Sequence, residues 1–380
     1  MLTPQAKAEL EKQHYRVVGS HSAVKTCGWT KSMIRGQGGC YKLKFYGIMS
    51  NQCMQMTTSI SCANRCTFCW RGYKAPVSKE WAWQVDDPQF ILENSIEQHL
   101  KLLAGFGGSS KANKRSFAAS KEVKHVALSL TGEPITYPKM NELVHKFHEQ
   151  EISTFIVTNA QYPEAVKSLA PITQLYLSID APTKELLKEV DQPLFPDFWE
   201  RTNQCLDLLA QKKQRTCIRL TIIKGINDKH LKEYAILIKK GNPDFLEIKS
   251  YMFVGESRER LKEENMPLHE EIVEFTKALL KYLPEYSLVT EHIPSRVVML
   301  AKNKFKKKDG WYTWIDFDKF HKLATSGKEF TSDDYLIKTP QTGLSGKGTL
   351  DEMPAEKKKK FLEKYSKYKI NEETEERDLD

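Results

Sequence analysis

Three cysteines with short, unequal spacing are the residues that most plainly indicate chemistry. Cys62, Cys66 and Cys69 lie in the stretch CANRCTFC, in a loop that follows an apolar run. Three thiolates on one loop can bind three irons of a cubane cluster and leave the fourth iron without a protein ligand. Zinc is the main alternative, but zinc sites generally use four ligands in paired, short spacings, which this pattern fits poorly. The triad therefore predicts an iron–sulfur cluster with one open iron.

A second set of cysteines lies immediately upstream of the first. Cys27, Cys40 and Cys53 are separated by twelve residues each, and glycines flank Cys40. The chain has too few cysteines for a disulfide scaffold, and clustered thiols then more often bind metal or do chemistry. We therefore predict a second three-cysteine cluster, with buried thiols as the alternative. Cys205 and Cys217, in a helical and a strand-like segment, are expected to be buried packing residues.

Short apolar runs alternate with segments of helical spacing through the middle of the chain. Such alternation predicts βαβ units and a parallel sheet. The expected fold is α/β, a partial, open TIM-like barrel of about six βα units with N- and C-terminal extensions. In such barrels the chemistry takes place at the carboxyl ends of the strands. The expected strands cover residues 44–57, 123–131, 154–159, 174–180, 217–225 and 245–252, and the expected helices 88–105, 138–150, 196–211 and 228–240.

Polar residues end several of these strands. They are Gly132, Glu133 and Pro134 after the second strand, Thr158 and Asn159 after the third, and Ser178 and Asp180 after the fourth. A glycine permits close approach of the backbone, and Glu133 can accept a hydrogen bond from a cationic group. A plain turn at Gly132, and helix caps at Asn159 and Asp180, are the alternatives. We expect these groups to face a bound cofactor.

The triad and the strand ends together resemble the radical S-adenosylmethionine superfamily, over roughly residues 55–255. The resemblance implies that the open iron of a 4Fe–4S cluster is chelated by S-adenosyl-L-methionine. It also implies that reduction of the cluster cleaves this cofactor to a 5′-deoxyadenosyl radical, so that the cofactor supplies the difficult chemistry and the protein positions it. Glu133 would then accept from the ammonium group of the cofactor.

The second cysteine set narrows the resemblance to the tRNA 4-demethylwyosine synthases of the wybutosine pathway, over most of residues 20–325. The matching features are Cys27, Cys40 and Cys53 and the segments CANRCTFCWRG, LTGEP, LSIDAP and WIDF. Members condense N1-methylguanosine at position 37 of phenylalanine tRNA with pyruvate, forming 4-demethylwyosine and releasing 5′-deoxyadenosine and methionine. Eukaryotic members carry an N-terminal flavin domain, which we expect this protein to lack. The resemblance is thus to the archaeal form and implies an external electron donor and two 4Fe–4S clusters.

Lys42, two residues after Cys40, matches the position proposed in that family for holding pyruvate as a Schiff base. A lysine Schiff base would make the keto acid electrophilic. A solvent-facing lysine on a strand is the alternative, and the open iron of the second cluster could bind pyruvate instead of Lys42 or together with it. Lys42 is the catalytic residue that the resemblance implies.

The charge of the chain is consistent with a nucleic-acid partner. Its net charge is +9 over 380 residues, although many basic enzymes bind no nucleic acid. An enzyme acting on a looped base must splay it out and stack it on an aromatic surface. Candidates for stacking are Trp70, Trp81, Trp83 and the stretch 311–314. Candidates for phosphate contacts are Lys111, Lys114 and Arg115, in residues 106–122, which are expected to form a long basic loop. Packing of the C-terminal aromatics onto the barrel, and plain solvated charge, are the alternatives.

The predicted organisation has four parts. They are a basic N-terminal extension with second-cluster cysteines (1–43), the radical S-adenosylmethionine barrel (44–300), a basic, aromatic C-terminal extension (301–355) and a charged tail expected to be disordered (356–380). No apolar run approaches the roughly 18 residues that a membrane span needs, and no signal peptide is recognisable. We expect a cytoplasmic monomer. Alternative functions are another radical S-adenosylmethionine RNA-modifying enzyme and a nonenzymatic iron–sulfur RNA-binding protein.

Overall fold

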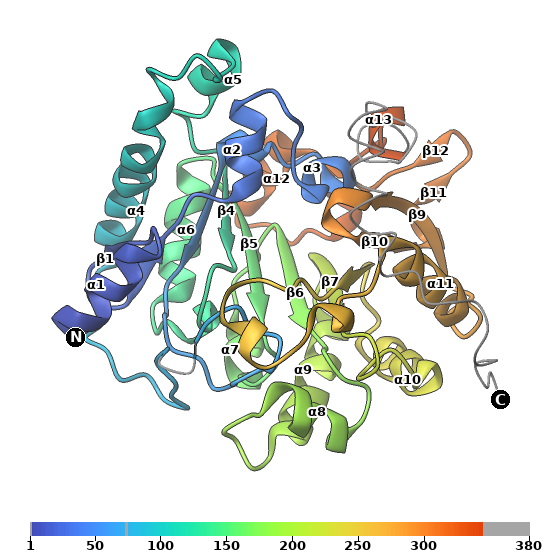
Figure 1. The fold of residues 1–380 in the computed structure, drawn as a ribbon. Helices are drawn as coiled ribbons and strands as arrows, with labels where there is room; N and C mark the ends of the chain where they lie inside the picture. The colour runs from blue at the N-terminus through green and yellow to red at the C-terminus, as the bar shows by residue number, and fades with distance from the viewer. Residues whose placement is uncertain (1, 73–74, 345–380) are drawn as a thin grey trace.

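Six parallel strands form the centre of the main sheet in the computed structural model, which describes residues 2–72 and 75–344. The strands follow one another across the sheet in chain order, as expected when each strand is followed by a crossover that returns over one face. The sheet curves into an open barrel, which confirms the predicted fold class (Figure 1). The strands are β3 (Cys53–Thr57), β4 (His125–Leu128), β5 (Ser153–Thr158), β6 (Gln174–Ser178), β7 (Arg215–Ile222) and β8 (Phe245–Ser250).

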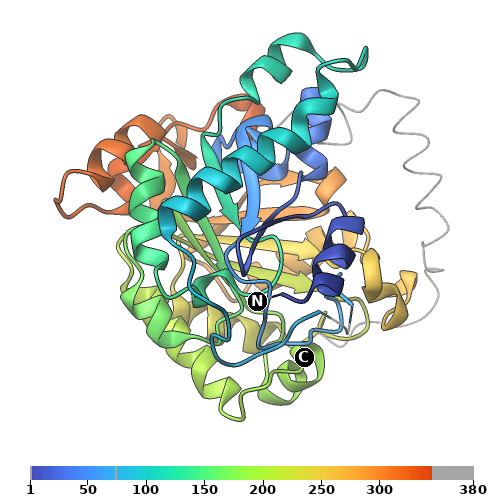
Figure 2. The ribbon, with the colours of Figure 1, turned by 90° about the vertical axis from the view of Figure 1, so that its left-hand side faces the viewer.

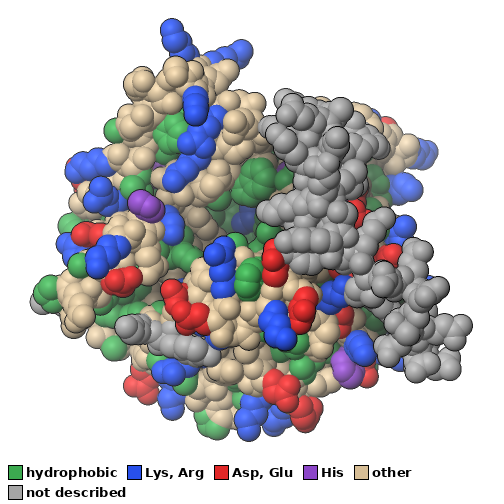
Figure 3. All heavy atoms as spheres, in the orientation of Figure 1, with side chains coloured by type: hydrophobic (Ala, Val, Ile, Leu, Met, Phe, Trp, Pro, Cys, Tyr) green, Lys and Arg blue, Asp and Glu red, His purple; other side chains and the backbone are tan. Residues whose placement is uncertain are grey.

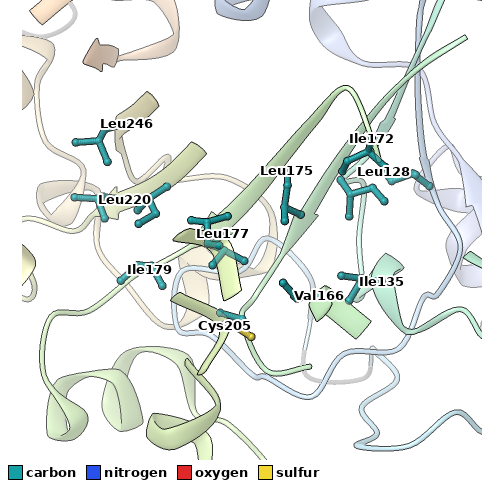
Figure 4. Close-up of a cluster of buried hydrophobic side chains, with 14 of the residues drawn as sticks. Leu128, Ile135, Val166, Ile172, Leu175, Leu177, Ile179, Cys205, Leu220 and Leu246 are labelled. Carbon is teal, nitrogen blue, oxygen red and sulfur yellow. The ribbon is translucent and has the colours of Figure 1, made fainter. Parts of the chain in front are cut away.

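Helices cover the outer face of this sheet. Figure 2 shows α4 and α6 crossing the strands on that side. A large apolar core lies between the helices and the sheet, and Figure 4 shows part of it, with Leu177 and Leu220 from the strands and Cys205 from α9. The covering helices are α4 (Pro88–Leu103), α6 (Met140–Glu149), α7 (Pro163–Ser168), α9 (Phe198–Gln211), α10 (Leu231–Gly241) and α11 (His269–Leu280), and α8 (Lys184–Asp191) follows β6.

A second apolar core fills part of the inner face of the barrel. Phe155, Tyr176 and Cys217 project inward from the strands and pack against Phe45 and Tyr46 of a short helix, α3 (Tyr41–Tyr46). Because the strands are buried on both faces, their sequences are nearly continuous runs of apolar residues. Both predicted packing cysteines, Cys205 and Cys217, are fully buried in these two cores, which confirms that expectation.

Segments before and after the parallel strands extend the sheet at both edges. On one side β2 (Ser22–Val24) pairs antiparallel with β3, and β1 (Arg16–Val18) pairs with β2; on the other, β10 (Val297–Lys302) pairs antiparallel with β8, and β9 (Tyr286–His292) with β10. The remaining described α-helices are α1 (Pro4–Lys12), α2 (Gly28–Ile34), α5 (Lys114–Ala119), α12 (Phe317–Ala324) and α13 (Gln341–Leu344). Two small antiparallel sheets pair β11 (Lys306–Lys307) with β12 (Gly310–Trp311) and β13 (Trp314–Ile315) with β14 (Leu336–Ile337). The four-part organisation itself stays a prediction.

Two of the expected elements are corrected by the structure. The first expected strand, 44–57, was wrong in its first half, because α3 covers Tyr41–Tyr46 and the strand begins at Cys53. Gly47 ends the helix with a positive φ of 82°, a conformation that favours glycine. The expected loop 106–122 contains the short helix α5, whose N-cap Asn113 accepts a hydrogen bond from the Ser116 amide.

Within the described part of the chain, no helix is both long and apolar enough to cross a membrane. The predicted charged tail, 356–380, and the end of the predicted C-terminal extension, 345–355, lie outside the described residues.

Candidate active site

The loop that carries the first cysteine triad follows β3 and is held from two directions. Its backbone bonds to the end of α8, where the Thr67 amide donates to the Val190 carbonyl over 2.8 Å. From the segment after β8, the Arg260 guanidinium donates to the carbonyls of Thr67 (Nε–O 2.9 Å), Cys69 and Arg71. The predicted ligands Cys62, Cys66 and Cys69 thus lie on a loop whose path is fixed by bonds to neighbouring βα units.

Burial affects two of the three thiols of this triad. Burial raises the pKa of Cys62 to about 11 and that of Cys66 well above its usual range, and the nearby Arg71 guanidinium opposes the shift at Cys62. Iron binding would reverse the protonation, because a coordinating thiol loses its proton. Among the described residues no three acidic, histidine or cysteine side chains converge as they do around a single ion. A cubane demands a different arrangement, with each thiolate on its own iron.

Gly132 and Glu133 lie in the loop that follows β4. Gly132 has a φ of 66°, and a Cβ there would meet the Ser59 carbonyl oxygen at 1.9 Å, so only glycine fits this approach of two loops. Glu133 is almost fully buried, and its Oε1 has no hydrogen-bond partner among the described residues. Burial raises the pKa of this carboxyl to about 7. A buried acceptor without a partner indicates a place for a donor that the protein itself does not supply.

Asn159 connects Glu133 to the cysteine triad. Its backbone amide donates to Glu133 Oε2 over 3.0 Å, and its side-chain amide donates to the Cys62 sulfur over 3.5 Å. The hydroxyl of Thr158 accepts from the Ala160 amide and shapes the same turn. The structure therefore brings Glu133, Asn159 and Cys62 together, although they follow three different strands.

The other predicted cofactor residues lie along the same edge but bond mainly to the protein. Ser178 Oγ accepts from Arg219 (Nη2–Oγ 3.2 Å), Asp180 Oδ1 accepts from the Thr221 amide over 3.2 Å, and the Pro134 carbonyl accepts from Thr58. Burial raises the pKa of Asp180 to about 6. These residues fit S-adenosylmethionine, because the unpartnered Glu133 oxygen beside Cys62 can accept a hydrogen bond from the ammonium group of this cofactor.

The second cysteine set lines a cavity of about 440 Å³ inside the barrel. Cys27 precedes α2, Cys40 is the N-cap of α3, and Cys53 begins β3, so that three separate elements bring their sulfurs to one cavity. Burial raises the pKa of Cys40 and of Cys53 to about 12, and the charge of Lys42 opposes the shift at both. These thiols can serve as ligands once a metal displaces their protons.

Lys42 lines the same cavity from the first turn of α3. Its Nζ lies 4.7 Å from the ring centre of Tyr176 and 5.8 Å from that of Phe155, two inward-facing residues of neighbouring strands. The lysine is therefore directed into the barrel and does not face solvent from a strand. Its amine lies in the cavity that also holds the second cysteine set.

Three charged residues in or near the cavity were not predicted from the sequence. They are Arg219 on β7, and Glu247 and Lys249 on β8. Burial lowers the pKa of Lys249 to about 8, and the neighbouring Arg219 charge adds to the shift. The two oxygens of Glu247 accept from the hydroxyls of Tyr41 (3.0 Å) and Tyr46 (2.9 Å). The sequence does contain an indication of them, because Arg219, Glu247 and Lys249 interrupt the otherwise apolar runs CIRLTII and FLEIKS. Burying a charged side chain costs free energy unless it has a partner or a function.

The tryptophans proposed for base stacking pack against other parts of the protein. Trp70 stacks on Tyr15 with parallel rings 5.8 Å apart, Trp81 packs edge-on against His21, and Trp83 packs in the same region as Trp70. Trp314 lies against Gly47 and donates to the Lys44 carbonyl over 2.9 Å, so it joins the C-terminal segment to α3. Packing is therefore the observed role of Trp314.

Comparison with known proteins supports the chemistry of this site. Residues 56–238 match the family model described as radical SAM superfamily, and residues 240–302 match the one described as wyosine base formation. A solved structure of TYW1 with a lysine-pyruvate adduct bound is 35% identical, with a TM-score of 0.72, covering 80% of this chain and 97% of that one. This chain belongs to the TYW1 family. A crystal structure of archaeal TYW1 is 32% identical, with a TM-score of 0.66, covering 80% and 98%.

Eukaryotic curated relatives of this chain are longer than it is. The S-adenosyl-L-methionine-dependent tRNA 4-demethylwyosine synthase of Oryza sativa subsp. japonica is 50% identical over 349 residues, which make up 91% of this chain and 53% of the rice protein. The TYW1 protein of Homo sapiens is 46% identical over 353 residues, 91% of this chain and 48% of the human protein. The chain therefore spans about half the length of the curated relatives it matches. As a radical SAM superfamily member, it belongs to proteins that use a 4Fe–4S cluster and S-adenosylmethionine.

Proposed function

We propose that this chain is an S-adenosyl-L-methionine-dependent tRNA 4-demethylwyosine synthase, which condenses N1-methylguanosine at position 37 of phenylalanine tRNA with pyruvate. One observation carries the proposal: Lys42 and Cys27, Cys40 and Cys53 line a single cavity within the barrel. A TYW1 protein 35% identical to this one has a structure with a lysine-pyruvate adduct, and Lys42 lines the cavity beside the cysteines, as Lys249 also does.

Two 4Fe–4S clusters would be held by the two cysteine sets. Cys62, Cys66 and Cys69 would bind the first, and Cys27, Cys40 and Cys53 the second. When bound to the first cluster and reduced, S-adenosylmethionine supplies a radical able to take a hydrogen atom from a methyl group. The residues of this chain would orient it: Glu133 would accept from the ammonium group, and Gly132, Pro134, Thr158, Asn159, Ser178 and Asp180 would line its site.

Pyruvate would bind in the cavity of the second cysteine set. The amine of Lys42 would add to the C2 carbonyl, and loss of water would leave a Schiff base that is a better electrophile than the ketone. The aromatic rings of Tyr176 and Phe155 exclude water on one side of the amine and limit where the carbonyl carbon can lie. The second cluster could bind the keto acid as well.

The tRNA would approach over basic parts of the surface. Lys and Arg side chains gather on the projecting end formed by α5, where Lys114 and Arg115 lie, with Lys111 in the preceding turn (Figure 3). A second basic region is the β11–β12 hairpin. The Nζ of Lys307 lies 4.1 Å from the ring centre of Tyr312, which directly follows β12. Lysines would contact phosphates and fix the position of the tRNA, and half-exposed rings would stack on unpaired bases.

The setting in the cell follows from the same proposal. A one-electron reduction needs a donor, which would be a separate protein. We infer that the enzyme is cytoplasmic, because tRNA and pyruvate are both present there. We also infer that it acts as a monomer.

Nucleoside mass spectrometry tests the proposal directly. Phenylalanine tRNA bearing N1-methylguanosine is incubated with anaerobically reconstituted protein, S-adenosylmethionine, reductant and pyruvate. A tricyclic nucleoside that forms only with pyruvate is expected. Deoxyadenosine without this nucleoside would point to another radical SAM RNA-modifying enzyme, whereas absence of deoxyadenosine would favour a nonenzymatic iron–sulfur RNA-binding protein.

Borohydride trapping tests the role of Lys42 separately. Wild-type protein incubated with pyruvate and reductant should gain the mass of one reduced pyruvate adduct, located on the peptide that contains Lys42. The variant Lys42→Ala should gain none. An adduct of unchanged yield in Lys42→Ala would remove this residue from the mechanism and leave the second cluster as the binding site for pyruvate.

A further inference from the structure

Three cationic side chains line the cavity of the second cysteine set. Lys42 comes from α3, Arg219 from β7 and Lys249 from β8. In the sheet Arg219 of β7 pairs with Glu247 of β8, and Lys249 lies two residues after Glu247 on β8. Since side chains alternate between the faces of a strand, Arg219 and Lys249 both project from the inner face into the barrel.

The protein itself compensates these charges only in part. In the described chain, the amine of Lys249 makes no hydrogen bond or ion pair, and the one hydrogen bond found for the Arg219 side chain is to the uncharged Ser178 hydroxyl. The carboxylate of Glu247 is fully buried, and a tyrosine hydroxyl occupies each of its two oxygens. It attracts Arg219 without forming a hydrogen-bonded pair with it.

Such an arrangement favours an anion in the cavity. A cationic side chain removed from water costs free energy unless it gains a partner, and a guanidinium beside an ammonium suits a planar carboxylate. In a 2-oxo acid the carboxylate is attached directly to the carbonyl carbon. An amine that attacks the carbonyl and cations that bind the carboxylate must therefore lie around one cavity, and Lys42, Arg219 and Lys249 do so.

We propose that Arg219 and Lys249 bind the carboxylate of the 2-oxo acid and thereby direct its carbonyl carbon to Lys42. The inference deepens the proposed function, because it assigns the specificity for a keto acid to two residues that do not react. It also explains why charged residues stand in two otherwise apolar strands. A neutral ketone, which lacks the carboxylate, gains nothing from this pair.

The test compares two carbonyl compounds in the trapping experiment with the full, reconstituted chain. Adduct yield is measured against the concentration of pyruvate and of acetone, in wild type, Arg219→Gln and Lys249→Gln. Loss of one charge-assisted hydrogen bond should raise the half-saturating pyruvate concentration roughly 10- to 100-fold and leave that of acetone unchanged. Lys302→Gln, a lysine of β10 outside the cavity, is the matched control and should behave as wild type.

Several outcomes would overturn the assignment. These are an unchanged half-saturating pyruvate concentration in both glutamine variants, an equal loss for acetone, or an adduct located on Lys249. Iron content of each variant is measured in parallel, because loss of iron with unchanged pyruvate trapping would assign the two cations to the cysteine thiolates. If a glutamine variant fails to fold, Arg219→Lys and Lys249→Arg keep the charge and should retain the preference for pyruvate. Absence of any adduct in wild type would instead contradict the proposed function.

Discussion

The guanidinium of Arg260 donates to the backbone carbonyl of Thr67 over 2.9 Å, and so ties the segment after β8 to the loop of the first cysteine triad. The same side chain also bonds the carbonyls of Cys69 and Arg71. These contacts join residues almost two hundred positions apart, which lie within the two different family matches, wyosine base formation and radical SAM superfamily. Arg260 is thus a positioning residue for the triad.

Replacement of Arg260 should weaken both the fold and the retention of iron. Arg260→Gln removes the charged donor from three carbonyls, and we expect the free energy of unfolding of the apo protein to fall by about 2–4 kcal/mol. Urea unfolding and iron content after reconstitution measure the two effects. Arg258→Gln is the control, because Arg258 is exposed and bonds only the Phe253 carbonyl among the described residues. Wild-type stability and iron content in Arg260→Gln would contradict the positioning role.

The binding of S-adenosylmethionine should depend on the ionisation of Glu133. Burial raises the pKa of this carboxyl to about 7, so it is neutral below that pH and negatively charged above it. Because only the charged form attracts an ammonium group, affinity should fall as the pH is lowered, by up to roughly tenfold per pH unit below 7. Equilibrium dialysis between pH 6 and 8.5 measures the dependence.

Two variants distinguish this ionisation from a general effect of pH. Glu133→Gln should bind more weakly at pH 8 and lose the pH dependence, whereas Glu185→Gln, at an exposed position of α8, should retain the wild-type profile. A profile in Glu133→Gln as steep as in wild type would assign the titration to another group.

Substitution of Gly132 should be poorly tolerated. In Gly132→Ala the new Cβ would meet the Ser59 carbonyl oxygen at 1.9 Å, at a φ of 66° that alanine disfavours. We expect a loss of at least about 2 kcal/mol in the free energy of unfolding. Gly105→Ala, which places its Cβ in open space, should change stability little. Equal stabilities of the two variants, by thermal or urea unfolding, would show that the two loops can separate without cost.

The two cysteine sets should contribute separately to the reaction. Cys66→Ala should abolish the formation of deoxyadenosine, whereas Cys40→Ala should leave most of it and abolish the tRNA product, because Cys40 lies in the cavity proposed for pyruvate. Chromatography of deoxyadenosine and mass spectrometry of the tRNA nucleosides measure the two outputs. If Cys40→Ala lost cofactor cleavage as completely as Cys66→Ala, the two sites would not be independent.

From the sequence alone, the type of chemistry and the class of fold could be predicted. The spacing of Cys62, Cys66 and Cys69 is local, so the ligands of one cluster can be predicted without knowledge of the fold. The alternation of apolar runs with helical spacing predicted the six parallel strands, because strands buried on both faces carry continuous apolar sequence. The end of the first expected strand was correct, but its beginning was not: Phe45 and Tyr46 are apolar because α3 fills the inner face of the barrel.

Which distant residues meet depends on the three-dimensional fold. Asn159 joins Glu133 to Cys62, Arg260 holds the triad loop, and Lys42 shares one cavity with Arg219 and Lys249. None of these relationships has a characteristic spacing, because each depends on the order and twist of the strands that bring the loops together. Periodicity reports which face of an element is buried, whereas a site built from the ends of several strands is defined by how those strands pair.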